Sequence, residues 1–162
     1  MRFVAALLAK GDINRLIGES QDIELRNRLK YCGNNVGIRQ PVVIEGPEGV
    51  IIEDDVSIAA FVHFWGQGGI SIGKGTMIAS HVAITSLTHD PNAPVMRETL
   101  ISGSVEIGEN VWIGAHSVIF SGVSIGENSV VAAGSVVRTN VPPNTVFAGV
   151  PAREVRKKQR SS

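Results

Sequence analysis

The chain has 162 residues, which suits one domain with a sizeable core. Its 15 basic and 15 acidic residues cancel, so its charge gives no reason to expect a nucleic acid or an anionic membrane as partner. No apolar run reaches the ~18 residues of a membrane span, and a single cysteine cannot form a disulfide within the chain. We therefore expect a cytoplasmic protein. Hydrophobic residues make up 43% of the chain but aromatic residues only 5%, which predicts an aliphatic core.

The first part of the chain, residues 1–35, mixes charged and apolar residues at helix-like spacing. Ile23, Leu25 and Leu29 could form a short apolar face, and Gly33 could end the helix. We expect residues 1–35 to form a cap of one or two short helices or irregular segments.

The clearest internal repeat runs over residues 107–142 and has a period of six. Cut in sixes, it reads IGENVW, IGAHSV, IFSGVS, IGENSV, VAAGSV and VRTNVP. Each first position is Ile or Val, each fifth is Val or Ser, and the fourth is Asn, His or Gly, of which Asn and Gly suit a left-handed backbone. Earlier blocks from Ile52 and from Ile72 follow the rule in other phases, which indicates small insertions at corners.

A period of six is too long for strand alternation and matches no helix, but it fits a short strand followed by a tight corner. Three such sides close a triangular coil of about eighteen residues, with the aliphatic residue inside and parallel pairing between coils. We therefore expect an all-β fold over residues 36–150, a parallel β-helix of about five coils. The period does not reveal its hand.

The repeat stops at His89 and resumes near Ile107, and we expect residues 90–106 to form a loop that projects from one corner. Long loops in compact folds are often functional, although a tolerated insertion is the alternative. His89 stands where the last coil side ends, and an exposed His can act as a general base near neutral pH. The alternative is a solvated loop histidine.

The other histidines carry weaker signals. His81 and His116 occupy the fourth position of their hexads, where a turn role suffices. His63 stands at a sixth position, where it could line an acceptor groove or simply face solvent. The spacing of these histidines does not reproduce a zinc triad, so we predict no metal site.

Three segments resemble one known family: TSLTHDP (85–91), EIGENVWIGAHSVIFSGVSIGENSVVAAGSVV (106–137) and PPNTVFAGVPAREVR (142–156). They are similar to the hexapeptide-repeat acyltransferases, in particular the maltose and galactoside O-acetyltransferases. The resemblance covers roughly residues 36–156. It implies left-handed coils and a homotrimer that binds acetyl-CoA at the subunit boundary. It also implies transfer of the acetyl group to a hydroxyl of a sugar or glycan, and we favour a polysaccharide or lipopolysaccharide. No Ser or Cys stands in a nucleophile-elbow or Cys–His pattern, so direct transfer is the simplest chemistry.

The resemblance also implies site residues. His89 stands at the position of the catalytic histidine, although Asp90 separates it from Pro91, where the family has His-Pro. A backbone amide around Gly114–Ala115 would meet the oxyanion. Arg138–Thr139 replaces a Thr-Lys pair. The residues expected to bind the cofactor are Gly114, Ala115, Ala133, Gly134, Arg138, Thr139, Arg153 and Arg156.

The acceptor is expected against aromatic side chains. Trp112 stands at an outward sixth position where the family often has Trp, and an uncovered Trp would be costly there. Trp65 breaks the hexad rule and is expected to shape the acceptor pocket or the trimer contact, and His63 is expected beside the acceptor. The basic tail, residues 151–162, suits the phosphates of CoA or is a solvated terminus.

Two further classes of function stay open at the level of the sequence. One is a sugar-nucleotide N-acetyltransferase on the same helix. The other is a protein without this chemistry, either a non-enzymatic solenoid or a relative of the γ-class carbonic anhydrases.

Overall fold

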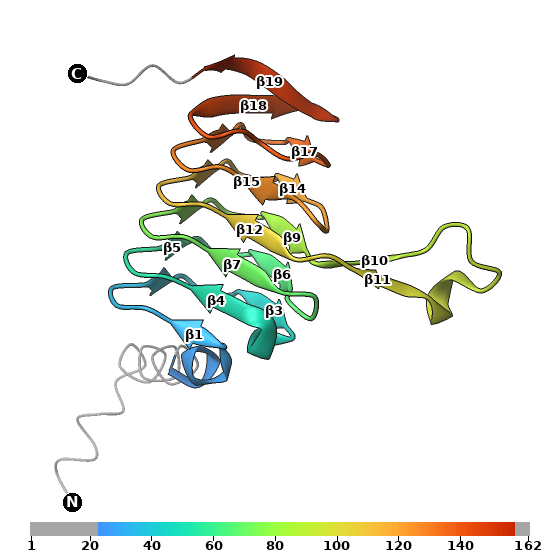
Figure 1. Ribbon diagram of the computed structural model, residues 1–162. Coiled ribbons are helices and arrows are strands. Elements are labelled where there is room, and N and C mark those ends of the chain that lie inside the picture. The colour runs from blue at the N-terminus through green and yellow to red at the C-terminus, as the bar shows by residue number, and fades with distance from the viewer. Residues whose placement is uncertain (1–22, 158–162) are drawn as a thin grey trace, which may run out of the picture.

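The computed structural model describes residues 23–157, which form a triangular solenoid with a projecting arm (Figure 1). Three sheets make its sides. The first sheet contains β1 (Tyr31–Cys32), β4 (Val50–Ile52), β7 (Ile70–Ile72), β12 (Val105–Ile107) and β15 (Ser124–Ile125). The second contains β2 (Gly37–Ile38), β5 (Ser57–Ile58), β8 (Met77–Ile78), β13 (Trp112–Ile113), β16 (Val130–Val131), β18 (Thr145–Gly149) and β19 (Ala152–Lys157). The third contains β3 (Val43–Glu45), β6 (His63–Trp65), β9 (Ala83–Thr85), β14 (Val118–Ile119) and β17 (Val136–Val137).

The chain visits the three sheets in turn, so each passage through them is one coil. Successive coils pair in parallel, and five complete coils are followed by a partial one that ends in the antiparallel pair β18–β19. Tyr31 pairs with Ile51 and Ile51 with Ser71, a step of 20 residues, whereas Glu106 pairs with Ser124, a step of 18. The predicted parallel β-helix of about five coils is confirmed, and the early coils carry the predicted insertions.

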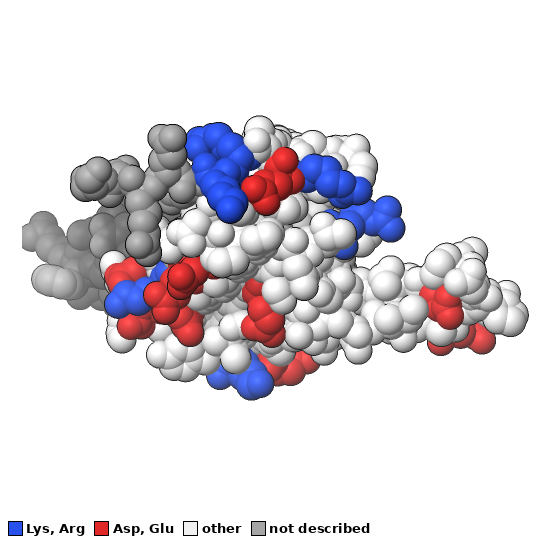
Figure 2. Space-filling view, turned by 45° about the horizontal axis from the view of Figure 1, so that its top comes forward, with Lys and Arg blue, Asp and Glu red and all other residues white. Residues whose placement is uncertain are grey.

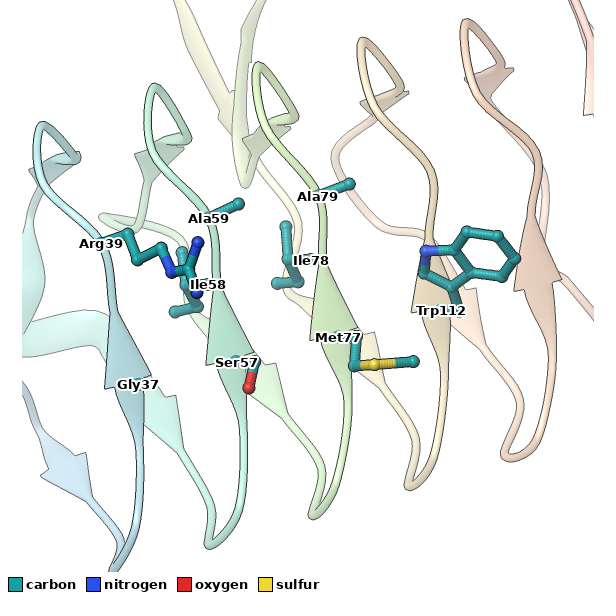
Figure 3. A pocket seen from close by; sticks show the side chains of 9 residues that line it. All are labelled: Gly37, Arg39, Ser57, Ile58, Ala59, Met77, Ile78, Ala79 and Trp112. Atoms are coloured by element: carbon teal, nitrogen blue, oxygen red, sulfur yellow. The ribbon is translucent and has the colours of Figure 1, made fainter.

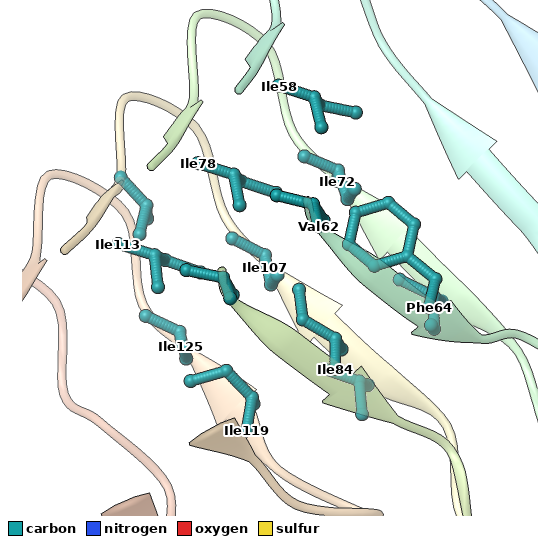
Figure 4. Close-up of a cluster of buried hydrophobic side chains, with 14 of the residues drawn as sticks. Ile58, Val62, Phe64, Ile72, Ile78, Ile84, Ile107, Ile113, Ile119 and Ile125 are labelled. Atoms are coloured by element: carbon teal, nitrogen blue, oxygen red, sulfur yellow. The ribbon is translucent and has the colours of Figure 1, made fainter. Parts of the chain in front are cut away.

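The interior is a stack of aliphatic side chains (Figure 4). Ile78 and Ile113 are neighbours in one ladder of the second sheet, and both are at most 2% exposed. The small fifth-position residues are buried beside them, and their hydroxyls are satisfied by the backbone: Ser129 donates to Pro142 O (2.8 Å) and Ser135 to Ala132 O (2.6 Å). Aliphatic packing and satisfied polar groups together make each coil a template for the next.

The corners depend on left-handed backbone. Between the second and third sheets, Phe61, His81 and His116 have φ of 65°, 61° and 60°. Their rings stack, with centroids 4.9 Å apart for Phe61 and His81 and 4.6 Å for His81 and His116. The predicted turn role of His81 and His116 is therefore confirmed.

The N-terminal part of the solenoid differs from the prediction. Residues 23–28 are helical, and Leu25 and Leu29 pack on the core, but Ile23 is 60% exposed, so including it in an apolar face was wrong. Gly33 does not end this helix. It lies after β1, packed so closely on the backbone of Asp54 that a side chain would clash.

The solenoid begins with β1, which pairs with β4, and therefore starts before residue 36. The cap predicted before residue 23 and the tail after residue 157 lie outside the described residues. Within residues 23–157, no helix is long and apolar enough to cross a membrane.

Candidate functional site

An arm projects from the corner between the third and first sheets (Figure 1). It is a hairpin of β10 (Leu87–His89) and β11 (Leu100–Ser102), with the 3-10 helix η2 (Met96–Glu98) near its tip; a second such helix, η1 (Pro47–Gly49), lies at the same corner two coils earlier. The Gly103 amide donates to Ser86 O (2.9 Å), which closes the root. The predicted loop bounds, 90–106, were wrong at both ends, because Leu87 already pairs across the arm and Val105 is already buried in the solenoid.

His89 is exposed at the end of β10, opposite Leu100. Its Nδ1 lies 2.8 Å from the carbonyl oxygen of Met96. A carbonyl only accepts, so this contact requires the proton on Nδ1 and leaves Nε2 of the neutral ring free to accept another proton. That tautomer is the one a general base needs.

The acidic neighbours of His89 are engaged elsewhere. The Asp90 carboxylate accepts from the Asn92 amide (2.9 Å), and Glu98 pairs with Arg97 (3.7 Å). The group that orients His89 is thus a backbone carbonyl seven residues along the chain. Sequence reasoning missed it, because any residue type supplies a carbonyl.

A hollow of about 440 Å³ opens beside His89, at the root of the arm. It is lined by Glu45, Trp65, Gln67, Thr85, Leu87, Thr88, His89 and Leu100. Glu45, Trp65 and Thr85 are register neighbours on three successive coils of the third sheet. The fold therefore brings two of the predicted site residues, His89 and Trp65, to one cavity.

His63 lies next to Trp65 on β6 but does not line the hollow. Its ring stacks on Trp65 with centroids 3.6 Å apart, and its Nε2 lies 3.5 Å from Oε1 of Glu45. That Nε2 is buried and has no hydrogen-bond partner, so the contact with Glu45 is one of proximity. His63 supports the wall of the hollow without lining it.

Trp112 lies elsewhere in the chain. It is 51% exposed on β13 of the second sheet and borders a separate hollow of about 340 Å³, together with Arg39 and Met77 (Figure 3). Gly37, Ser57, Ala59 and Ala79 also line that hollow. A single chain therefore does not bring Trp112 to His89.

The residues predicted to bind the cofactor fall on two corners and on β19. Gly114, Ala115, Ala133 and Gly134 lie between the second and third sheets. The Gly114 amide already donates to Val131 O (2.8 Å), and a Cβ on Gly114 would lie 2.5 Å from Ala133 N, so this glycine allows the coils to approach. The Ala115 amide makes no hydrogen bond within residues 23–157. It is thus the one of the two predicted amides that is free for an oxyanion.

Arg138 and Thr139 follow β17 and lie at the corner between the third and first sheets. The Arg138 guanidinium lies 5.7 Å from the centroid of the Phe120 ring, a cation–π contact. Arg153 and Arg156 are exposed on β19, and Figure 2 shows basic side chains, with acidic ones among them, on the C-terminal end of the solenoid. No group of three potential metal ligands exists within the described residues.

Comparison with known proteins places this geometry in a family. A sequence model of the hexapeptide repeat of succinyl-transferase matches residues 104–138. The chain is 46% identical over 140 residues to the galactoside O-acetyltransferase of Escherichia coli K12, covering 85% of this chain and 68% of that protein. It is 37% identical over 134 residues to a candidate lipopolysaccharide biosynthesis O-acetyl transferase of the same organism, WbbJ, covering 76% and 67%.

A third relative carries a different chemistry in its name. The dTDP-4-amino-4,6-dideoxy-D-glucose acyltransferase of Escherichia coli is 31% identical over 158 residues, covering 89% of this chain and 82% of its own length.

Among solved structures, the hexapeptide-repeat acetyltransferase VCA0836 of Vibrio cholerae, complexed with acetyl coenzyme A, superposes with a TM-score of 0.82 at 30% identity. The match covers 88% of this chain and 78% of that one, and it confirms the expected left-handed parallel β-helix. The chain therefore belongs to the hexapeptide-repeat acyltransferases, in the branch that contains the galactoside O-acetyltransferase.

Proposed function

We propose that this protein is an acetyl-CoA-dependent O-acetyltransferase that acts on a hydroxyl of a sugar or glycan. The observation that carries the proposal is the position of His89, whose Nδ1 is held by the Met96 carbonyl at the edge of the hollow lined by Trp65. The similarity to O-acetyltransferases, and to a structure that binds acetyl coenzyme A, supports this choice of donor and reaction.

The reaction is a direct transfer. His89 Nε2 takes the proton of the acceptor hydroxyl while the hydroxyl oxygen attacks the thioester carbonyl carbon. The tetrahedral oxyanion that forms accepts a hydrogen bond from the Ala115 amide. The C–S bond then breaks, and the CoA thiolate takes the proton from His89. The only cysteine, Cys32, is half-buried in β1 of the first coil, beside Arg26 (3.6 Å) and two coils before the arm, so it is badly placed to act as a covalent relay.

The complete site combines two copies of the chain. Ala115 lies at the corner between the second and third sheets, whereas His89 lies on the arm at the corner between the third and first sheets. Trp112 lies on the second sheet, so a single copy presents these groups in different directions. A homotrimer, with the projecting hairpin of one copy facing the Ala115 corner of the next, closes a groove for the pantetheine chain between Thr139 of the first copy and Gly114, Ala133 and Gly134 of the second. Arg138, Arg153 and Arg156 would meet the CoA phosphates. A trimer mass in light scattering tests this arrangement, and a stable monomer that retains full activity would contradict it.

A second candidate is N-acylation of a nucleotide-linked amino sugar, favoured by the similarity to the dTDP-amino-sugar acyltransferase. Both candidates require the same cofactor, so the acceptor separates them. Hydroxyl and amino acceptors should be compared by release of free CoA thiol, with the acetylated position read by NMR. Thiol release with glycosides and an ester product is expected. An amide product, or the absence of saturable acetyl-CoA binding, would contradict the proposal.

A further inference from the structure

The charges along the third sheet change sign from one end of the site to the other. Glu45, Trp65 and Thr85 are in register on successive coils, and the same column continues through Phe120 to Arg138. At about 4.8 Å per coil, Glu45 and Arg138 stand roughly 19 Å apart. The carboxylate therefore lies at the acceptor end of the column and the guanidinium at the end proposed for the CoA phosphates.

The described lining of the hollow beside His89 carries no Lys or Arg side chain that would attract a phosphate. Glu45 is the one lining residue with a fixed charge, and it is negative; none of the lining residues is Lys or Arg. The cation on the arm, Arg97, already pairs with Glu98, and the Arg97 side chain is 86% exposed. A phosphate bound in this hollow would be repelled by the Glu45 carboxylate, whose side chain is 51% exposed, so the repulsion should be strongest at low salt.

What the hollow does offer is a fixed aromatic plane. One face of Trp65 is covered by His63 at 3.6 Å, and the half-buried indole lines the hollow. His63 lies against Glu45 in turn, with its Nε2 3.5 Å from Oε1 of Glu45, so the three side chains form one contiguous group. A preorganised aromatic plane binds the apolar C–H face of a pyranose, while a carboxylate accepts hydrogen bonds from the ring hydroxyls.

We infer that Glu45 and Trp65 select an uncharged sugar residue and exclude a sugar that is still joined to its nucleotide diphosphate. Acetylation then follows the glycosyl-transfer step that removes the nucleotide, and the acceptor is a finished or growing glycan. This inference rests on the proposed function, because it assumes that His89 and this hollow receive the acceptor.

The test compares kcat/KM of the full-length protein, at saturating acetyl-CoA, for methyl α-galactopyranoside and methyl α-glucopyranoside against the UDP-sugars of the same anomeric configuration. We expect the methyl glycosides to be preferred by at least about 10-fold. E45Q keeps the shape of the side chain and removes its charge, so it should shift this ratio about 3- to 10-fold toward the UDP-sugars and leave the KM for acetyl-CoA unchanged.

Two controls separate this charge and this ring from general effects. E106Q removes an equally negative, exposed side chain from the first sheet and should leave the ratio unchanged. W65A should raise the KM of the methyl glycosides by about 10-fold or more, whereas W65F should retain most of the affinity because the ring remains.

A wild-type preference for the UDP-sugars, or equal shifts of the ratio in E45Q and E106Q, would overturn this inference alone. Absence of thiol release with every acceptor, neutral or charged, would overturn the proposed function and this inference with it.

Discussion

The solenoid and the arm differ in how their strands are paired and in how deeply their side chains are buried. In the solenoid, every coil pairs with its neighbours, and residues such as Ile84 and Ile113 are fully buried. In the arm, β10 and β11 pair only with each other within the described chain, and Leu100 and Ile101 are 59% and 46% exposed. Stability therefore resides in the coils, while His89 stands on a segment that contributes little to it.

This division has a physical advantage for a transferase. A stack of coils holds its corners in place, since each corner is fixed by hydrogen bonds to the coil before and after it. An exposed hairpin can instead meet a second copy of the chain and close a site between them. The apolar side chains of the arm, Val95, Met96, Leu100 and Ile101, are the surface that such contact would cover.

The largest expected effect comes from removing the arm. Because the Gly103 amide already donates to Ser86 O at the root, residues 88–101 can be replaced by Asn-Gly, which favours a tight hairpin turn. We expect acetyl transfer to fall at least about 100-fold, with the thermal midpoint shifted by only a few degrees. Loss of cooperative unfolding would show instead that the arm supports the coils.

A matched pair of core and arm substitutions comes next. I113A opens a cavity in a fully buried ladder and should cost about 2–5 kcal/mol of the free energy of unfolding. L100A removes an apolar side chain that is mostly exposed and should cost less than about 1 kcal/mol. Urea unfolding measures the free energy of unfolding of both variants. Equal losses would contradict the claim that the stability resides in the coils and not in the arm.

Two glycines test the coils more finely. G114A places a methyl group 2.5 Å from the backbone nitrogen of Ala133, and we expect a loss of about 1–3 kcal/mol in the free energy of unfolding. G122N is the control, because Gly122 has φ of 77° with open space around it, and Asn tolerates that conformation. A G114A protein as stable as G122N would mean that the coils separate easily.

The smallest effect concerns the cofactor. R138Q should raise the KM for acetyl-CoA by about 3- to 10-fold and leave kcat nearly unchanged, because the phosphates are remote from the reacting carbonyl. K74Q removes a cation that pairs with Asp55 on another corner (3.7 Å) and serves as control. A drop in kcat without a change in KM would place Arg138 near the chemistry instead.

The sequence predicts the coils well because the six-residue period is repeated. The assignment of Ile or Val to the first position of one hexad is therefore supported by the hexads before and after it. The arm has no such redundancy. The strand of Leu87, Thr88 and His89 is too short for alternation to reveal it, and its partner lies eleven or more residues away. Its bounds were therefore misplaced, although its existence and the position of His89 were evident from the break in the repeat.

The candidate site was predictable only as far as residue types matter. Trp65 was found because an aromatic residue breaks the hexad rule, but the Met96 carbonyl and the free Ala115 amide are backbone groups that every residue has. Glu45 was missed because its column becomes visible only when three coils are stacked in register. The predicted proximity of Trp112 to the acceptor requires a second copy of the chain.

The role of His89 as general base is tested most directly by the turnover of H89A at saturating acetyl-CoA and methyl β-galactopyranoside. The unfolding curve of H89A is measured as well, and H81N serves as control. His81 is a corner histidine with φ of 61°, a conformation that Asn adopts readily, so H81N should keep near wild-type turnover. We expect kcat of H89A to fall by about 10²–10⁴-fold while its unfolding curve and its affinity for acetyl-CoA stay unchanged. Turnover within about twofold of wild type in a folded H89A protein would contradict this role of His89.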